Sequence, residues 1–153
     1  MRQSIHVMLT LALLGTVLDA AMMTKFNPQI QTGGDLSVDK LREQNRIVVQ
    51  KAAEGIGETL PQKVDDFTKL VAIDSNGTRL IYTFEVTSGP KSDATLRQEG
   101  DKMAPRILSG ICRSAKRFMA ADIALTYRYI SSASRHEILR VDADKSRCPE
   151  LLQ

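Results

Sequence analysis

The sequence contains no tryptophan, and aromatic residues make up only 5% of its 153 positions. Aliphatic side chains must therefore build the core, and a hydrophobic fraction of 42% is enough for one ordinary domain. Histidine is nearly absent too, with His6 near the N-terminus and His136 near the C-terminal end. One usable histidine and two widely separated cysteines make no zinc-like ligand set. We therefore expect neither a metal nor a cofactor.

Sequence motifs of catalysis are also missing. There is no GxSxG, no glycine-rich phosphate loop and no HExxH. The adjacent carboxylates Asp65 and Asp66 follow Pro61 in a predicted turn, where both side chains are expected to face water. These absences favour a protein that is not an enzyme.

The charge is mildly positive, because 21 basic residues face 18 acidic ones, with a pI near 9.0. This balance is not typical of a nucleic-acid partner. Basic residues outnumber acidic ones from Lys102 onward, which is more typical of an ordinary solvated face, and an acidic partner or an anionic membrane surface is the alternative. Arg113, Lys116 and Arg117 lie within about one helical turn and form a candidate binding patch.

The N-terminal segment, residues 1–21, has the pattern of an export signal. Arg2 precedes a mostly apolar run from Ile5 to Leu18, which is shorter than the roughly 20 residues that span a bilayer. Two alternatives remain open: an inner-membrane anchor formed by residues 5–23, and a buried helix of the domain. Residues 22–35 are predicted to be a linker, and residues 36–153 one domain.

The domain shows helical spacing first and then strand-like alternation. Ser37 offers a helix cap, and the helix is expected to end between Glu54 and Leu60. Alternating residues on both sides of Asn76-Gly77 predict a β-hairpin over residues 67–87 with a type I′ turn.

A second helical region precedes a second hairpin. The helical region starts at Ser92 or Asp93 and ends near Cys112, and Pro105 is expected to divide or bend it. A further helical turn is expected over residues 114–121, followed by a hairpin over residues 122–142. The predicted fold class is α+β, with an antiparallel sheet of about four strands packed against two main helices.

Two cysteines lie on either side of the second hairpin. Because Cys112 closes the second helical region and Cys148 follows the last strand, behind an export-type leader, we predict a disulfide between them. The alternative is two buried free thiols in a cytosolic protein. Tyr127 and Tyr129 share a strand face with Leu125, which suits core residues better than a ligand platform, although both remain candidate binding residues.

Several short motifs carry a family resemblance. They are Leu60-Pro61, Val64-Asp65-Asp66 with Thr68, Leu80-Ile81-Tyr82, Gly110-Ile111-Cys112, Tyr127-x-Tyr129 and the final Cys148. Their order resembles a group of small uncharacterised bacterial exported proteins. It is also similar to the disulfide-bonded AspS-type pilotins, which chaperone the outer-membrane secretin of the type II secretion system. The resemblance implies an α+β fold and a partner-binding groove between a helix and the sheet.

This chain departs from the pilotin pattern at two places. Pilotins normally carry an acylated N-terminal cysteine, which has no counterpart near the leader, and Ser131-Ser132-Ala133-Ser134 replaces the usual glycine of the last hairpin. The resemblance therefore supports the fold and the compartment better than the pilotin role.

The sequence as a whole favours a non-enzymatic binding or accessory protein of the cell envelope, periplasmic or secreted. Its expected partner is another envelope protein or peptide, with membrane association through the N-terminal segment. The alternatives are an inhibitor or immunity protein, a host-interacting protein, a structural envelope component, and an enzyme built from carboxylates and tyrosines.

Overall fold

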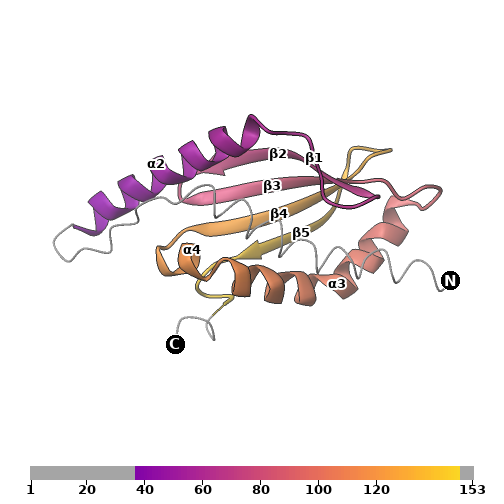
Figure 1. The fold of residues 1–153 in the computed structure, drawn as a ribbon. Coiled ribbons are helices and arrows are strands. Elements are labelled where there is room, and N and C mark those ends of the chain that lie inside the picture. The colour runs from indigo at the N-terminus through magenta and orange to yellow at the C-terminus, as the bar shows by residue number, and fades with distance from the viewer. Residues whose placement is uncertain (1–36, 149–153) are drawn as a thin grey trace.

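The computed structural model describes residues 37–148, which form five strands and three helices (Figure 1). The signal or anchor expected over residues 1–21 and the linker expected over residues 22–35 lie outside the described residues. The buried residues of both long helices belong to one core cluster with the inner residues of the strands. Both helices therefore pack on the same face of the sheet.

The first helix, α2, spans Val38–Gly57 and confirms the predicted cap. The backbone N–H of Lys40 donates to the Ser37 hydroxyl at 3.4 Å, and Asp39 places a negative charge in the first turn, where the helix dipole favours it. Val49, Ala52 and Ala53 are buried against the sheet. Helical spacing of small and aliphatic side chains thus gives α2 one apolar face.

The predicted first hairpin is confirmed as β2 (Thr68–Asn76) and β3 (Arg79–Val86). Its turn differs by one residue from the expectation, because Asn76 pairs with Arg79 and leaves Gly77-Thr78 as the loop. Of these residues only Gly77 has a positive φ, of 60°. A glycine at the first central position is the geometry of a type II′ turn, so the predicted type I′ turn at Asn76-Gly77 is wrong.

The second long helix, α3, runs unbroken over Asp93–Ser114 with Ser92 as its cap, and α4 (Lys116–Ala120) follows at once. Pro105 lies inside α3, which changes direction along its length (Figure 1). Because proline has no backbone N–H, Pro105 cannot donate the helical hydrogen bond to the carbonyl of Asp101. Both residues are exposed. Since water can satisfy that carbonyl, the helix continues through the proline.

The second predicted hairpin is confirmed as β4 (Ala124–Ser131) and β5 (Glu137–Ala143). A short strand, β1 (Gln62–Lys63), pairs with β2 at the opposite edge, so the strand order is β1-β2-β3-β4-β5.

The sheet is mixed, because β3 and β4 pair in parallel while every other pair is antiparallel. The fold class is α+β as predicted, but the expected antiparallel sheet of about four strands is corrected to a mixed sheet of five. The physical reason is the connection between the hairpins: α3 and α4 carry the chain back along the sheet, so β4 starts at the end where β3 starts.

The predicted disulfide is present between Cys112, near the end of α3, and Cys148, beyond β5, with a Cα–Cα distance of 5.6 Å. It joins the helical layer to the segment after the last strand. Both cysteines are buried. The bond therefore fixes α3 over the β5 side of the sheet.

Candidate functional site

The inner face of the two central strands holds four aromatic rings. α2 lies over β2 and part of β3, whereas α3 lies over β5, so these rings lie between the helices (Figure 1). Phe84 is 5.2 Å from Tyr127 and 5.0 Å from Tyr129, measured between ring centroids, and Tyr82 is 5.2 Å from Tyr127. Tyr127 is 3% exposed and Tyr129 6%. These two candidate binding residues therefore lie in the core layer.

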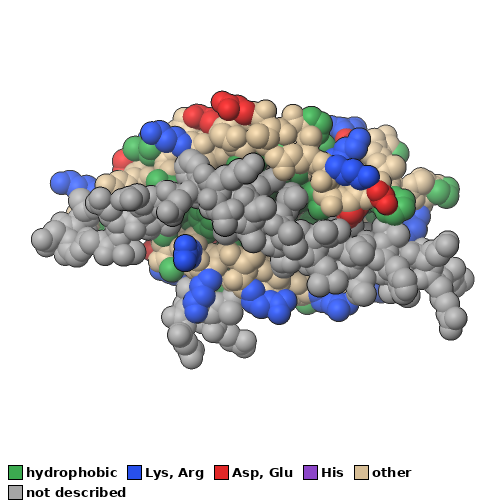
Figure 2. Space-filling model, in the orientation of Figure 1, with side chains coloured by type: hydrophobic (Ala, Val, Ile, Leu, Met, Phe, Trp, Pro, Cys, Tyr) green, Lys and Arg blue, Asp and Glu red, His purple; other side chains and the backbone are tan. Residues whose placement is uncertain are grey.

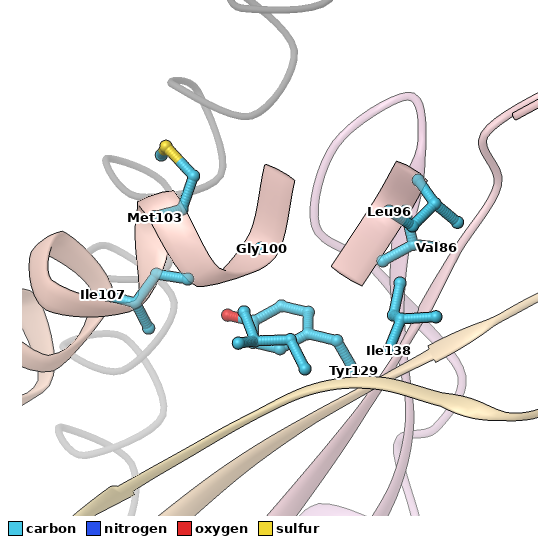
Figure 3. Close-up of a pocket in the computed structure, with 8 residues that line it drawn as sticks. Val86, Leu96, Gly100, Met103, Ile107, Tyr129 and Ile138 are labelled. Atoms are coloured by element: carbon cyan, nitrogen blue, oxygen red, sulfur yellow. The ribbon is translucent and has the colours of Figure 1, made fainter. Parts of the chain in front are cut away.

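An apolar pocket opens between α3 and the sheet, and we call it the α3 pocket (Figure 3). The space open to the centres of water molecules in it is ≈ 20 Å³. This is room for a side-chain tip and far below the roughly 300 Å³ of a typical small-molecule site. Its lining combines three strands with one face of α3: Val86, Leu96, Gly100, Met103, Ile107, Tyr129, Ile138 and Leu139.

Two residues of α3 decide the shape of this pocket. A Cβ added at Gly100 would lie 3.2 Å from the Cβ of Leu139, so glycine lets the helix approach β5 closely. Met103 is partly exposed at the pocket, and its side chain is unbranched and flexible. The pocket can therefore adjust to an entering apolar group by moving Met103.

Exposed basic side chains follow the outer side of α3 and continue onto α4. We call them the basic stripe: Lys102, Arg106, Arg113, Lys116 and Arg117. None of the five forms an ion pair with another residue of the 37–148 region. Figure 2 shows blue side chains along the lower edge, where Figure 1 places α3 and α4. The predicted patch of Arg113, Lys116 and Arg117 is thus part of a longer row.

The outer face of the sheet carries a polar network. Arg79 donates to Thr126 Oγ1 at 3.0 Å and to Asp142 Oδ1 at 3.1 Å, and it also lies 3.9 Å from Asp144. A hydrogen bond from the Ser146 hydroxyl is the main cause that lowers the pKa of Asp144, with backbone N–H groups and Arg79 adding to it. Each carboxylate is satisfied by a partner, which is typical of a structural network.

The remaining acidic candidates are also engaged locally. Asp66 pairs with Lys63 at 2.7 Å, while Asp65 accepts from the backbone N–H of Phe67 at 2.8 Å. Asp93 accepts a hydrogen bond from Ser134 at 2.7 Å, which is the main cause that lowers its pKa. Asp66 faces water as expected, whereas the Oδ2 atom of Asp65 is buried and has no hydrogen-bond partner among the described residues, so the expectation that both side chains face water is wrong for Asp65.

Two further properties concern only the part of the chain that the structure describes. Within residues 37–148, no three or more His, Cys, Asp or Glu side chains gather closely enough to hold a metal ion. No helix in that range combines the length and the apolar character needed to cross a membrane.

The resemblance implied a groove between a helix and the sheet without assigning its residues, and the predicted basic patch lacked two of the five stripe residues, Lys102 and Arg106. Met103 and Ile107 repeat four residues apart, and so do Lys102 and Arg106, which is the signal that could have found both. Pro105 was expected to divide or bend this helix, and a divided helix would place Lys102 and Arg113 on different elements. Because α3 is continuous, these residues lie on one element.

The geometry defines a class of small α+β domain: one mixed sheet, two long helices on one face, and a disulfide from the second helix to the segment after the last strand. The fold is shared with solved structures of a secreted protein and of secretion-system pilotins. No family model matches the sequence, and no curated protein matches it.

Three similar structures can be named. A protein described as secreted from Pseudomonas aeruginosa has a TM-score of 0.60 at 15% identity, over 74% of this chain and 98% of that one. The pilotin EpsS of the Vibrio vulnificus type 2 secretion system has a TM-score of 0.57 at 14% identity, over 72% and 96%. The type II secretion pilotin AspS of Vibrio cholerae has a TM-score of 0.52 at 9% identity, over 72% and 97%. The resemblance predicted from the sequence is confirmed for the fold.

Proposed function

We propose that this chain is a non-enzymatic binding protein of the bacterial cell envelope that assists a secretion-system or other envelope protein. The observation that carries the proposal is the α3 pocket, an apolar opening far smaller than a typical small-molecule site, next to a row of basic side chains that form no ion pair within residues 37–148. Such a surface suits a side chain and a charged segment of another protein. The shared fold with two pilotins supports the same class of function.

A location outside the cytoplasm is supported by the disulfide. Bonds of this kind form and persist in oxidising compartments such as the periplasm. The bond encloses 36 residues of sequence separation and is buried at both ends, as expected of a structural bond. The periplasm, or secretion beyond it, is the proposed location.

The hydrogen bonds and ion pairs of the carboxylates support a non-enzymatic function. The carboxylates of the outer-face network are held by Arg79 and Ser146, and Asp93 is held by Ser134. The α3 pocket contains one polar side chain in its lining, Tyr129, among aliphatic neighbours. These surroundings suit packing and recognition better than proton transfer.

The proposal can be tested by crosslinking the tagged full-length chain in its native cells and recovering its partner. Wild type is compared with Met103→Glu, which places a charge at the pocket, and with Val38→Glu, which adds the same charge on the exposed start of α2. We expect one envelope protein, with a type II secretin as the first candidate, to be recovered with wild type and Val38→Glu and lost with Met103→Glu.

Thermal unfolding of each variant establishes that it is folded. Recovery of the same protein by a folded Met103→Glu variant, or of no specific envelope protein by wild type, would contradict the proposed function. A milder variant, Met103→Ser, replaces Met103→Glu in the comparison if the charge prevents folding.

A further inference from the structure

The basic stripe begins on α3 and ends on α4. Lys102, Arg106 and Arg113 are separated by four and seven residues, which places them on one face of α3, whereas Lys116 and Arg117 lie on α4, after the non-helical Ala115. From Lys102 to Arg113 the row extends about 16 Å at 1.5 Å per residue. This length is that of three turns of a helix or of a short extended peptide.

Most nearby cations outside the stripe have acidic partners. Lys91 contacts Glu99 at 2.8 Å, and Lys145 contacts Asp122 at 2.6 Å. The stripe residues lack such partners within residues 37–148, so their charges are not neutralised by the described domain. Parallel like charges on one helix repel one another. An anionic ligand laid along the row would relieve that repulsion.

The stripe and the α3 pocket share the same turns of α3. Met103 follows Lys102 directly, and Ile107 follows Arg106, so the pocket residues and these two basic residues lie on adjoining faces of the same two turns of α3. In Figure 3, Met103 and Ile107 extend from consecutive turns of α3. A segment lying along α3 would meet cations on one side and an apolar opening on the other.

We propose that the basic stripe and the α3 pocket together bind an acidic amphipathic segment of a protein partner, with its carboxylates along the stripe and one apolar side chain in the pocket. This inference rests on the proposed function and names the chemistry of the partner. Charge complementarity of this kind sets orientation and accelerates association.

A protein segment fits these observations better than a lipid surface. The exposed large hydrophobic residues of the described domain are Val38 and Ile47 on α2 and Phe67 before β2, so none accompanies the stripe. Peripheral membrane helices combine basic residues with exposed apolar ones that enter the interface. A single narrow row beside a pocket matches an elongated peptide.

The test uses a synthetic helical peptide with glutamates on one face and leucines on the next, and a matched peptide with lysines in place of the glutamates. Binding to the full-length protein is followed by fluorescence anisotropy at low salt. The stripe variant is Arg106→Glu/Arg113→Glu, and the control is Lys40→Glu/Lys51→Glu on α2, which changes the net charge equally at exposed positions. Vesicles containing anionic phosphatidylglycerol form the lipid arm.

We expect the acidic peptide to bind wild type, and the stripe variant to bind it about tenfold more weakly, while the α2 control stays within about twofold. The lysine peptide should not bind. Equal weakening in both variants, failure of wild type to bind the acidic peptide, or stripe-dependent binding of vesicles alone would overturn the inference.

The two proposals fail in different ways. If the stripe variant still recovers the same envelope protein as wild type after crosslinking in cells, the stripe inference is wrong and the binding function stands. If wild type recovers no specific envelope protein, the binding function itself is wrong.

Discussion

Removal of the Cys112–Cys148 disulfide is expected to destabilise the domain by about 4 kcal/mol. The bond closes a loop with a sequence separation of 36, which contains α4, β4 and β5. In the chain-entropy model, closing a loop of this length costs the unfolded chain about 13 cal/mol/K, which is about 4 kcal/mol at 25 °C. The loss is a large part of the 5–15 kcal/mol that stabilises a typical domain.

The variant for this test is Cys112→Ala/Cys148→Ala, compared with oxidised and reduced wild type. For a domain of this size, about 4 kcal/mol corresponds to a fall in Tm of about 15 °C, which circular dichroism measures directly. Urea unfolding gives the free energy independently. Reduced wild type should lose nearly as much stability as the variant, because both lose the same constraint.

A loss below about 1 kcal/mol in both samples would refute the reasoning, since the entropic term would then be absent. A large loss in the variant alone would also refute it, because the effect would then come from missing side-chain volume at two buried positions.

Three further predictions concern local packing and charge. The pKa of Asp144 is lowered below its ordinary value of 3.8, so its contribution to stability is present above that pH and is lost as the pH falls through the folded pKa. Wild type should exceed Asp144→Asn in urea stability near neutral pH and lose that advantage below pH 3.8, and a constant difference would contradict this. A double-mutant cycle of Arg79→Ala and Asp142→Ala should give a coupling of about 0.5–1 kcal/mol, because both side chains are about one-third exposed, and a coupling near zero would contradict the outer-face network. Gly100→Val should lower stability by about 1–3 kcal/mol, since its Cβ would lie 3.2 Å from Leu139, and an unchanged Tm would show that α3 can move away from β5.

Local features of the sequence predicted the elements well. Ser37 and Ser92 mark helix starts that the structure confirms, and alternating residues predict both hairpins, because capping and side-chain alternation depend on neighbours in the chain. Cys112 and Cys148 could be paired from their positions alone, since two cysteines allow one bond.

Features that depend on how elements pack were harder to predict. The parallel pairing of β3 and β4 follows from the path of α3 and α4 over the sheet, and no residue of either strand specifies it. The turn at Gly77 shifted by one residue because strand register, set by packing, decides which residues form the loop. Pro105 lies inside a continuous helix at an exposed position, next to the exposed Asp101, and that exposure follows from how α3 packs on the sheet.

The lining of the α3 pocket was hard to predict from the sequence for the same reason. Val86, Tyr129 and Ile138 come from three strands and meet under Gly100, so their proximity follows from the tertiary arrangement. Three of the five residues of the basic stripe, Arg113, Lys116 and Arg117, were predicted as a patch, and its extension to Lys102 required that α3 continue through Pro105. Tyr127 and Tyr129 were correctly weighed as core residues, because they alternate with Leu125 on one strand face.

The central claim, that the surface of α3 binds another envelope protein, is tested most directly by photo-crosslinking from position 103 in living cells. A photoreactive phenylalanine derivative replaces Met103, and a matched one replaces Asp74 on the exposed outer face of β2. We predict one major crosslinked envelope protein from position 103, diminished by Arg106→Glu/Arg113→Glu and absent from position 74. No crosslink from position 103, or the same product from both positions, would contradict the account.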